Sequence, residues 1–235
     1  MKVIILAGGL GTRISEETET KPKPMVEIAG APILWHIMNL YAMQGFCEFV
    51  IATGYKSEVI DDYIGSISDP WDVETLETGI DTQTGGRIKQ CIDYINEPTA
   101  LCTYGDGLAN VLVKDLLEAH NRSKRIVTLT AVRPPARFGY VRIENELVTH
   151  FGEKNQADEG WINGGFFVIN NKVTDYISDD LEPFETGALP RLSESNNLGA
   201  YKHFGFWKPM DTLREKIELE SLANNPGTTP WFDLP

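Results

Sequence analysis

The chain has 235 residues, of which 42% are hydrophobic and 23% are charged, a composition that is ordinary for a soluble globular protein with a large core. Its 34 acidic residues outnumber 21 basic residues and give a net charge of −13. Because this charge repels nucleic acid at long range, we expect no DNA or RNA partner. A polyanionic substrate must therefore meet local positive charge together with a divalent metal ion.

The cysteines and the start of the chain indicate a compartment. Cys47, Cys91 and Cys102 lack the Cys-x-x-Cys spacing of a metal or redox motif, which predicts free thiols in a reducing, cytoplasmic environment. The apolar run after Met1 is too short for a signal-peptide core or a membrane span, so we expect no membrane partner. We find no internal repeat or linker, and we expect one domain over residues 1–235.

The first 25 residues contain the strongest local signal. A short apolar run at residues 2–7 enters the glycine-rich turn Gly8-Gly9-Leu10-Gly11-Thr12-Arg13. This order predicts a buried strand followed by a loop whose backbone amides face an anion. Arg13 adds a positive charge, and Lys23 adds another between two prolines that hold its backbone extended. We interpret this stretch as a cradle for a nucleotide triphosphate.

Other readings of the glycine loop fit less well. A Walker loop needs a lysine before a serine or threonine, and residues 8–15 contain no lysine. A dinucleotide fingerprint built on Gly9 and Gly11 would place its third small residue at Ile14, which is a poor match. A plain tight turn would explain the glycines alone equally well, and Arg13 and Lys23 favour phosphate.

Helices and strands are predicted to alternate through the first half of the chain, which indicates a parallel sheet. Apolar spacing predicts a helix over residues 32–41 and strands over 49–52 and 71–78. A short helix is expected from Ser57, and an amphipathic helix behind Gly85-Gly86-Arg87. Amides at such a helix start can meet a base or a phosphate, although a simple helix-start turn explains the glycines equally well.

One aspartate is a candidate metal ligand, and another lies at the start of a predicted helix. Asp106 lies in Gly105-Asp106-Gly107, directly after a predicted buried strand over residues 100–104. In open α/β sheets ligands bind at the carboxyl ends of strands, so this position favours a metal, although Asp-Gly is also a common turn pair. Asp211 precedes a helix predicted over residues 213–222, and helix capping explains an aspartate at this position.

In the second half of the chain we predict a helix and a strand of the main sheet, then a pair of antiparallel strands outside it, then further strands of the main sheet. A helix over 112–120 and a strand over 126–132 precede an antiparallel excursion at residues 140–143 and 147–151. An aromatic strand over 161–169 contains a glycine pair on which a ring-shaped ligand can rest, or which packs against a neighbouring backbone. We predict a final strand over 201–206 and a tail over 226–235. The histidines lack metal-ligand spacing and receive no role: His36, His120, His150 and His203.

Taken in order, five sets of residues resemble the signature of the sugar-1-phosphate nucleotidyltransferases, and within that family the cytidylyltransferases that act on glucose 1-phosphate. Each motif is common alone, whereas the combination is specific and spans nearly the whole chain. The motifs are Gly8-Gly9-Leu10-Gly11-Thr12-Arg13 with Pro22-Lys23-Pro24-Met25, Thr84-Gly85-Gly86-Arg87, Thr103-Tyr104-Gly105-Asp106-Gly107, Trp161-Ile162-Asn163-Gly164-Gly165-Phe166-Phe167 and Gly205-Phe206-Trp207-Lys208-Pro209-Met210-Asp211-Thr212.

The resemblance implies a fold and a reaction. The fold is α/β, a Rossmann-like mixed, mainly parallel sheet flanked by helices, with a small antiparallel excursion. The reaction is the Mg²⁺-dependent conversion of CTP and α-D-glucose 1-phosphate to CDP-glucose and pyrophosphate, and we expect a homo-oligomer. An acceptor phosphate attacking another phosphate needs positioning and charge neutralisation and no general base. Mg²⁺ commonly takes one or two carboxylates plus substrate phosphates.

The resemblance also implies roles for individual residues. Asp106 and Asp211 would share Mg²⁺, Arg13 and Lys23 would meet the CTP phosphates, and Lys154 would grip the acceptor phosphate; these five form the catalytic set. Glu153, Asn163 and Glu185 would face the sugar. The nucleotide would be bound by Leu6, Ala7, Gly8, Gly9, Leu10, Gly11, Thr12, Arg13, Lys23, Thr82, Gly86, Arg87 and Gly105.

The chain departs from the family pattern in three places. The segment between Gly54 and Gly79 is shorter than the family's, Gly152 stands where glutamine is usual, and Asn155 stands where proline is usual. These changes affect base choice, assembly and the acceptor site. They keep open a second hypothesis, nucleotidyl transfer to another sugar 1-phosphate or phosphomonoester. A third hypothesis is a nucleotide-binding regulatory subunit without turnover, against which the retained aspartates and lysines argue.

Overall fold

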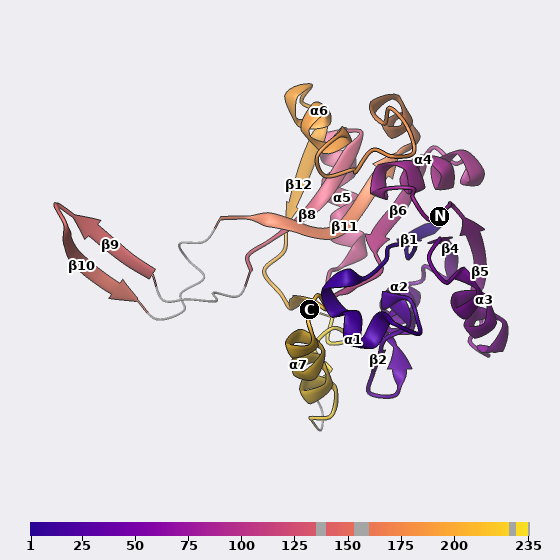
Figure 1. Ribbon diagram of the computed structural model, residues 1–235. Coiled ribbons are helices and arrows are strands. Elements are labelled where there is room, and N and C mark those ends of the chain that lie inside the picture. The colour runs from indigo at the N-terminus through magenta and orange to yellow at the C-terminus, as the bar shows by residue number, and fades with distance from the viewer. Residues whose placement is uncertain (135–139, 153–159, 226–228, 235) are drawn as a thin grey trace.

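The computed structural model describes residues 1–134, 140–152, 160–225 and 229–234. Its centre is a seven-stranded sheet in the order β12-β8-β11-β6-β1-β4-β5 (Figure 1). Within it β11 runs antiparallel to β6 and β8, and the other neighbours are parallel. The predicted mixed, mainly parallel sheet is therefore confirmed. The strands are β1 (Val3–Leu6), β4 (Glu48–Thr53), β5 (Asp72–Glu77), β6 (Thr99–Tyr104), β8 (Val127–Val132), β11 (Ile162–Asn170) and β12 (Leu198–Lys202).

Helices cover both faces of this sheet because its central strands are apolar on both sides. In β1, Val3 and Ile5 belong to one hydrophobic cluster, whereas Ile4 and Leu6 belong to the other, as the two-residue period of a strand requires. The first cluster takes residues from α2 (Ile33–Ala42), α3 (Ser57–Ser66), α5 (Val113–Ser123) and α7 (Leu213–Ala223). The second takes residues from α4 (Thr84–Ile95), α6 (Ala188–Glu194) and the 3-10 helix η4 (Asn171–Tyr176).

The single strand predicted over residues 201–206 is wrong, because the chain bends there. β12 ends at Lys202, and the buried ring of His203 lies 3.0 Å from the Phe206 carbonyl across the bend. The chain then forms β13 (Trp207–Pro209), which pairs antiparallel with β7 (Gly107–Ala109) in a separate two-stranded sheet. An apolar run does not reveal such a bend, since both halves satisfy the same strand pattern.

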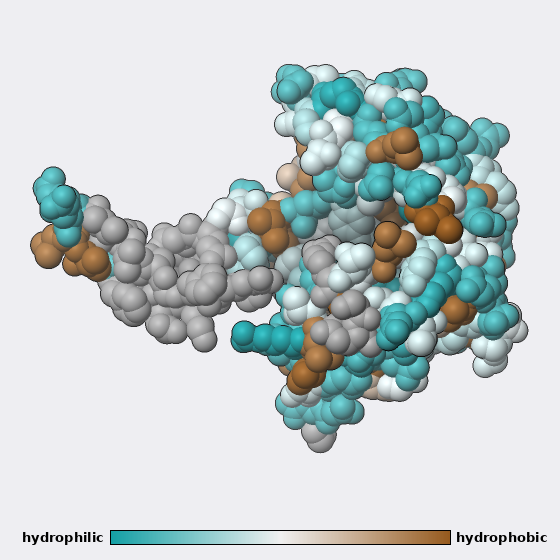
Figure 2. Space-filling model, viewed as in Figure 1, coloured by the Kyte–Doolittle hydropathy of each residue, from teal (hydrophilic) through white to brown (hydrophobic). Residues whose placement is uncertain are grey.

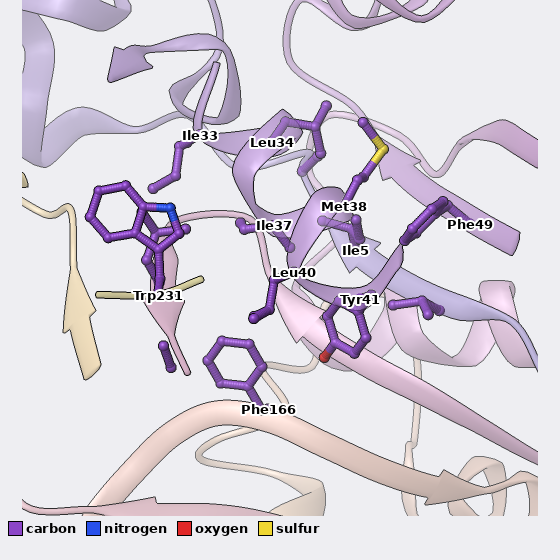
Figure 3. Close-up of a cluster of buried hydrophobic side chains, with 14 of the residues drawn as sticks. Ile5, Ile33, Leu34, Ile37, Met38, Leu40, Tyr41, Phe49, Phe166 and Trp231 are labelled. Atoms are coloured by element: carbon purple, nitrogen blue, oxygen red, sulfur yellow. The ribbon is translucent and has the colours of Figure 1, made fainter. Parts of the chain in front are cut away.

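The tail predicted over residues 226–235 is also wrong for its described part, residues 229–234. Trp231 is fully buried and lies in the cluster that contains Ile33 and Ile37 of α2 (Figure 3). Its indole nitrogen donates to Nδ1 of His36 over 3.3 Å, and Nε2 of His36 donates to the Ile28 carbonyl over 2.8 Å. This pairing requires the neutral imidazole, in agreement with burial, which lowers the pKa of His36.

The predicted antiparallel excursion is confirmed as a hairpin of β9 (Tyr140–Glu144) and β10 (Leu147–Gly152). The hairpin lies apart from the main sheet in Figure 1. Leu147 and Val148 near its turn are 67% and 52% exposed, and Figure 2 shows hydrophobic residues at this end.

Two further expectations concern thiols and membranes. Cys47, Cys91 and Cys102 are all free, as predicted, and the last two are buried. Burial raises the pKa of Cys91 to about 12, so its thiol stays protonated. No helix within the described ranges has the length and apolar character needed to cross a membrane.

Replacing Trp231 by alanine tests whether the end of the chain belongs to the core. We expect Trp231→Ala to lower the free energy of unfolding by about 3–5 kcal/mol, since it empties a fully buried site. Urea denaturation followed by circular dichroism measures this loss. Phe204, an aromatic side chain that is 79% exposed, provides the control, and Phe204→Ala should cost about 0.5 kcal/mol or less. Equal midpoints for the two variants would contradict the assignment.

Candidate functional site

A cavity of about 740 Å³ lies at the carboxyl ends of β1 and β6. This is the size of a small-molecule site, and it is the edge of the sheet where α/β proteins bind ligands. Most of the residues that we singled out from the sequence line it. They are Leu6, Ala7, Gly8, Gly9, Leu10, Gly11, Thr12, Lys23, Thr82, Arg87, Gly105, Asp106, Asn163, Glu185 and Asp211.

The remaining predicted residues lie elsewhere or outside the description. Gly86 is absent from the cavity lining, and a Cβ there would come within 2.5 Å of the Asp180 backbone. Its glycine therefore allows α4 to pack closely against residues 178–184, and its nucleotide contact stays a prediction. Glu153 and Lys154 lie outside the described residues, as does the side chain of Arg13.

Asp106 and Asp211 converge on one cation, which is the ammonium group of Lys23. The Lys23 nitrogen lies 2.7 Å from Oδ2 of Asp106 and 2.7 Å from Oδ1 of Asp211. The Lys23 side chain is only 9% exposed, whereas the two carboxylates are 28% and 25% exposed and face the cavity. Such charge-assisted contacts are short and strong. The sequence analysis brought all three residues into the site, but it did not predict this pairing of lysine with both aspartates.

The short β7–β13 ribbon explains why two aspartates so distant in sequence meet. Gly107 pairs with Pro209, and the amide of Met210 donates to the Asp106 carbonyl over 2.8 Å. These bonds fix the residues next to both aspartates side by side. A sequence pattern cannot show this pairing, because β7 and β13 contain only three residues each.

Thr212, and not Asp211, caps the N-terminus of α7. Thr212 is the N-cap of α7 and accepts a hydrogen bond from the Glu215 amide, while the Glu215 carboxylate accepts from the Thr212 amide, forming a capping box. The same carboxylate accepts from the Asp211 amide over 2.9 Å. The cap therefore holds the backbone of Asp211, and the carboxylate of Asp211 is left to bind Lys23.

Lys23 is held by a rigid backbone. It opens the 3-10 helix η2 (Lys23–Met25), with Pro22 before it and Pro24 after it. Gly11 packs against it with a φ of +64°, and a Cβ on this glycine would lie 3.1 Å from Cβ of Lys23. Because the prolines and this close approach fix the backbone, motion of the ammonium group comes from rotation of the side chain.

Arg87 supports the glycine loop from behind. Its guanidinium donates to the carbonyls of Gly8 over 2.9 Å and Thr53 over 2.8 Å, and it also reaches the Thr78 hydroxyl. The residue is 3% exposed, and burial lowers the pKa of its guanidinium. A Cβ at Gly8 would come within 2.1 Å of the guanidinium, so a side chain at this loop position would push Arg87 out of its observed hydrogen bonds. The observed donors serve backbone carbonyls and the Thr78 hydroxyl, and a direct contact of Arg87 with the nucleotide stays a prediction.

A hydrogen-bonded group of polar side chains lines another part of the cavity. Glu185 accepts from the Tyr104 hydroxyl over 2.5 Å and from the Thr84 hydroxyl over 2.7 Å. Asn163 donates to the Tyr104 oxygen over 3.2 Å and accepts from the Gly165 amide over 2.9 Å. Burial and the nearby charge of Glu185 raise the pKa of Tyr104, so its phenol stays a donor. The group presents polar atoms suited to sugar hydroxyls.

Several residues of the lining were missed by the sequence analysis. Thr84 and Tyr104 both lie inside motifs quoted above, and their positions at a helix start and a strand end were the available signals. The indole nitrogen of Trp207 donates to the Gly164 carbonyl over 2.8 Å, which no local pattern predicts. The other missed lining residues include Ile80, Asp81, Gln83 and Pro209.

Comparisons with known proteins agree with this geometry. Residues 2–217 match the family described as nucleotidyl transferase. A glucose-1-phosphate cytidylyltransferase of Salmonella typhi is 44% identical over 98% of this chain and 98% of its own length. A D-glycero-alpha-D-manno-heptose 1-phosphate guanylyltransferase of Aneurinibacillus thermoaerophilus is 34% identical over 74% of this chain and 76% of its own length. The resemblance described from the sequence motifs is confirmed.

A solved structure shares the fold. HddC from Yersinia pseudotuberculosis, crystallised in complex with GMP-PN, superposes with a TM-score of 0.74 at 25% identity, covering 94% of this chain and 98% of HddC. Its fold places the sheet and its helices as in this chain.

Gly105 and Gly107 flank Asp106 and provide a matched pair of substitutions. A Cβ at Gly105 would come within 2.7 Å of the Leu6 carbonyl and 3.0 Å of Pro24, whereas a Cβ at Gly107 meets nothing within 4 Å. We expect Gly105→Ala to destabilise the protein by about 1–3 kcal/mol through overpacking, and Gly107→Ala to cost much less. Denaturation midpoints of the two variants check this difference. A Gly105→Ala variant as stable as Gly107→Ala would contradict it.

Proposed function

This chain belongs to the nucleotidyl transferase family, and we propose that it is an enzyme that converts CTP and α-D-glucose 1-phosphate to CDP-glucose and pyrophosphate. The observation that carries this proposal is the convergence of Asp106 and Asp211 on one cation inside the cavity. The cytidylyltransferase of Salmonella typhi, similar over 98% of this chain, supports the choice of base and sugar.

The residues present fit a divalent ion. The ammonium group of Lys23 contacts one oxygen of Asp106 and one of Asp211, which supports a cation position between these carboxylates. Two carboxylates leave further coordination positions for phosphate oxygens and water, which is the arrangement that Mg²⁺ favours with nucleotides. We therefore assign Asp106 and Asp211 as its ligands. When bound, Mg²⁺ would neutralise charge on the triphosphate and help align it.

The chain's own residues position the two substrates. The glycine loop over residues 6–12 would bind CTP through its backbone amides, with Thr82 and Gly105 beside the nucleotide and Arg13 and Lys23 on its phosphates. Asn163 and Glu185 would bind hydroxyls of the sugar, since their hydrogen bonds to Tyr104 and Thr84 hold them in place. Glu153 and Lys154, by the same resemblance, would complete the acceptor site.

The reaction is then a single displacement. An oxygen of the sugar phosphate attacks the α-phosphorus of CTP, a new P–O bond forms, and the bond to the β-phosphate oxygen breaks to release pyrophosphate. The attacking oxygen is already anionic, so no general base is required. Lysine and arginine side chains lower the repulsion between the two anions, and the cavity supplies their alignment.

The setting of the enzyme follows from the same reasoning. Three free cysteines suit a reducing compartment, so we place the enzyme in the cytoplasm, with its substrates as small anions and no nucleic acid or membrane partner. The expected homo-oligomer stays a prediction, supported by the exposed apolar residues of the β9–β10 hairpin.

A second candidate function keeps the chemistry and changes a substrate. The heptose relative, 34% identical, transfers a guanylyl group, so the fold also occurs with another base and another sugar. The departures at Gly152 and Asn155 lie beside the residues assigned to the acceptor. A regulatory subunit without turnover is disfavoured because Lys23 and both aspartates are retained in a cavity of nucleotide size.

A substrate panel decides between these functions. Purified protein is incubated with Mg²⁺, each of the four ribonucleoside triphosphates or dTTP, and several sugar 1-phosphates, and released pyrophosphate is measured by a coupled assay. We expect release only when CTP and glucose 1-phosphate are present together. Turnover with another pair would support the second function, and nucleotide-induced stabilisation without any pyrophosphate would support the regulatory subunit.

Substitution of Asp106 tests the assigned metal ligand. We expect Asp106→Asn to lower kcat by about a thousandfold or more, because one of the two carboxylates that neutralise and align the metal is lost. Binding of CTP, measured by calorimetry, should persist through the glycine loop. Asp62→Asn, on the exposed surface of α3, is the control and should keep full activity. Normal turnover by Asp106→Asn would dismiss the metal assignment.

A further inference from the structure

We propose that Lys23 occupies the metal position of the free enzyme, so that a divalent ion enters only by displacing its ammonium group from Asp106 and Asp211. This inference rests on the proposed function, which assigns those aspartates to a metal. It adds that Lys23 competes with the metal for the two carboxylates in the free enzyme and binds phosphate only after it has left them.

The distances support one shared position. The Lys23 nitrogen lies 2.7 Å from an oxygen of each aspartate, which puts it between them. Mg²⁺ would have to approach those oxygens to about 2.0–2.1 Å, and the ammonium group blocks this approach. Because two like charges repel strongly at such separations in a partly buried site, lysine and metal cannot share the carboxylates.

The charges in the site indicate when a metal ion can replace Lys23 between the aspartates. One lysine between two aspartates leaves an excess of one negative charge, so the pair is only partly neutralised. A divalent ion would neutralise it fully, but it would leave a displaced lysine in a site where its side chain is 9% exposed. A buried ammonium group without a partner is costly. The lysine therefore needs a new anion before the metal is favoured.

A triphosphate supplies that anion. Lys23 and the glycine loop line the same cavity, and the prolines on both sides keep the lysine backbone in place. Side-chain rotation then transfers the ammonium group from the aspartates to the phosphates. Metal affinity is thereby low in the free enzyme and high in the nucleotide complex, which makes the two binding events cooperative.

Manganese binding to the free enzyme tests this exchange without any turnover. Electron paramagnetic resonance measures unbound Mn²⁺ in the absence of nucleotide for the wild type and Lys23→Met. We expect the variant to bind Mn²⁺ roughly tenfold or more tightly than the wild type. A neighbouring cation lowers the affinity of a carboxylate for a proton by about one to three logarithmic units, and the same repulsion acts on a metal ion. Equal affinities, or no binding by Lys23→Met at millimolar Mn²⁺, would overturn the proposal.

Lys21→Met is the matched control. Lys21 lies two residues before Lys23, and its ammonium group faces Glu27 at 3.4 Å rather than the aspartates. The Lys21→Met substitution removes the same charge from the same segment as Lys23→Met, but it leaves the contacts of the aspartates in place. The affinity of this variant for Mn²⁺ should therefore equal that of the wild type. A gain as large as that of Lys23→Met would mean that net charge alone acts, and it would also overturn the exchange.

Asp106→Asn in the Lys23→Met background separates this proposal from the proposed function. Loss of the tight site in the double variant places the metal on Asp106, whereas unchanged Mn²⁺ binding would mean that the metal assignment itself fails. If Lys23→Met binds no better than the wild type while Asp106→Asn still abolishes turnover, the metal site stands and only the exchange is rejected.

Thermal unfolding provides an independent measure. Without metal, Lys23→Met leaves two carboxylates facing each other, so its melting temperature should fall and should rise with Mn²⁺ by more than that of the wild type. Lys23→Gln serves for the same measurements where the methionine variant does not fold. Identical Mn²⁺ shifts in variant and wild type would contradict the exchange.

Discussion

The ion pairs between Lys23 and the two aspartates are the constraint on which the site depends. Asp106 follows a central strand, Asp211 precedes the last helix, and the β7–β13 ribbon ties them together. Two ionised carboxylates that lie close together repel each other, and a cation between them relieves that repulsion. In this structure Lys23 supplies the positive charge between the two carboxylates, so any other cation that enters the site has to replace that charge.

Close backbone approaches make the rest of the cavity possible. Gly8 leaves room for the guanidinium of Arg87, and Gly105 lets the end of β6 lie against the Leu6 carbonyl. Both glycines exclude a Cβ where two chain segments meet, and this leaves the loop after β1 open toward the cavity. The absence of side chains at these glycines lets Arg87 pack against one side of the loop, and it leaves the backbone amides on the other side free to bind an anion. This explains why a glycine-rich loop and a buried arginine occur together.

The two parts of the cavity differ in the charge of the side chains that line them. Around Lys23 the side chains are charged and suit phosphates, whereas around Glu185 neutral hydroxyl and amide groups hold a single carboxylate in place. This division matches a substrate pair in which a triphosphate meets a sugar phosphate.

From the sequence alone, apolar periodicity predicted most of the strands and helices, and the ordered motifs predicted the family, its mixed sheet and many of the residues that line the cavity, because these signals are local in the chain. The tertiary structure decided the rest. It showed Lys23 between the aspartates, Arg87 bonded to backbone carbonyls, the bend after Lys202 and the burial of Trp231. Each of these depends on contacts between residues far apart in the chain, and a local pattern carries no information about which distant partner a buried charge or ring will meet.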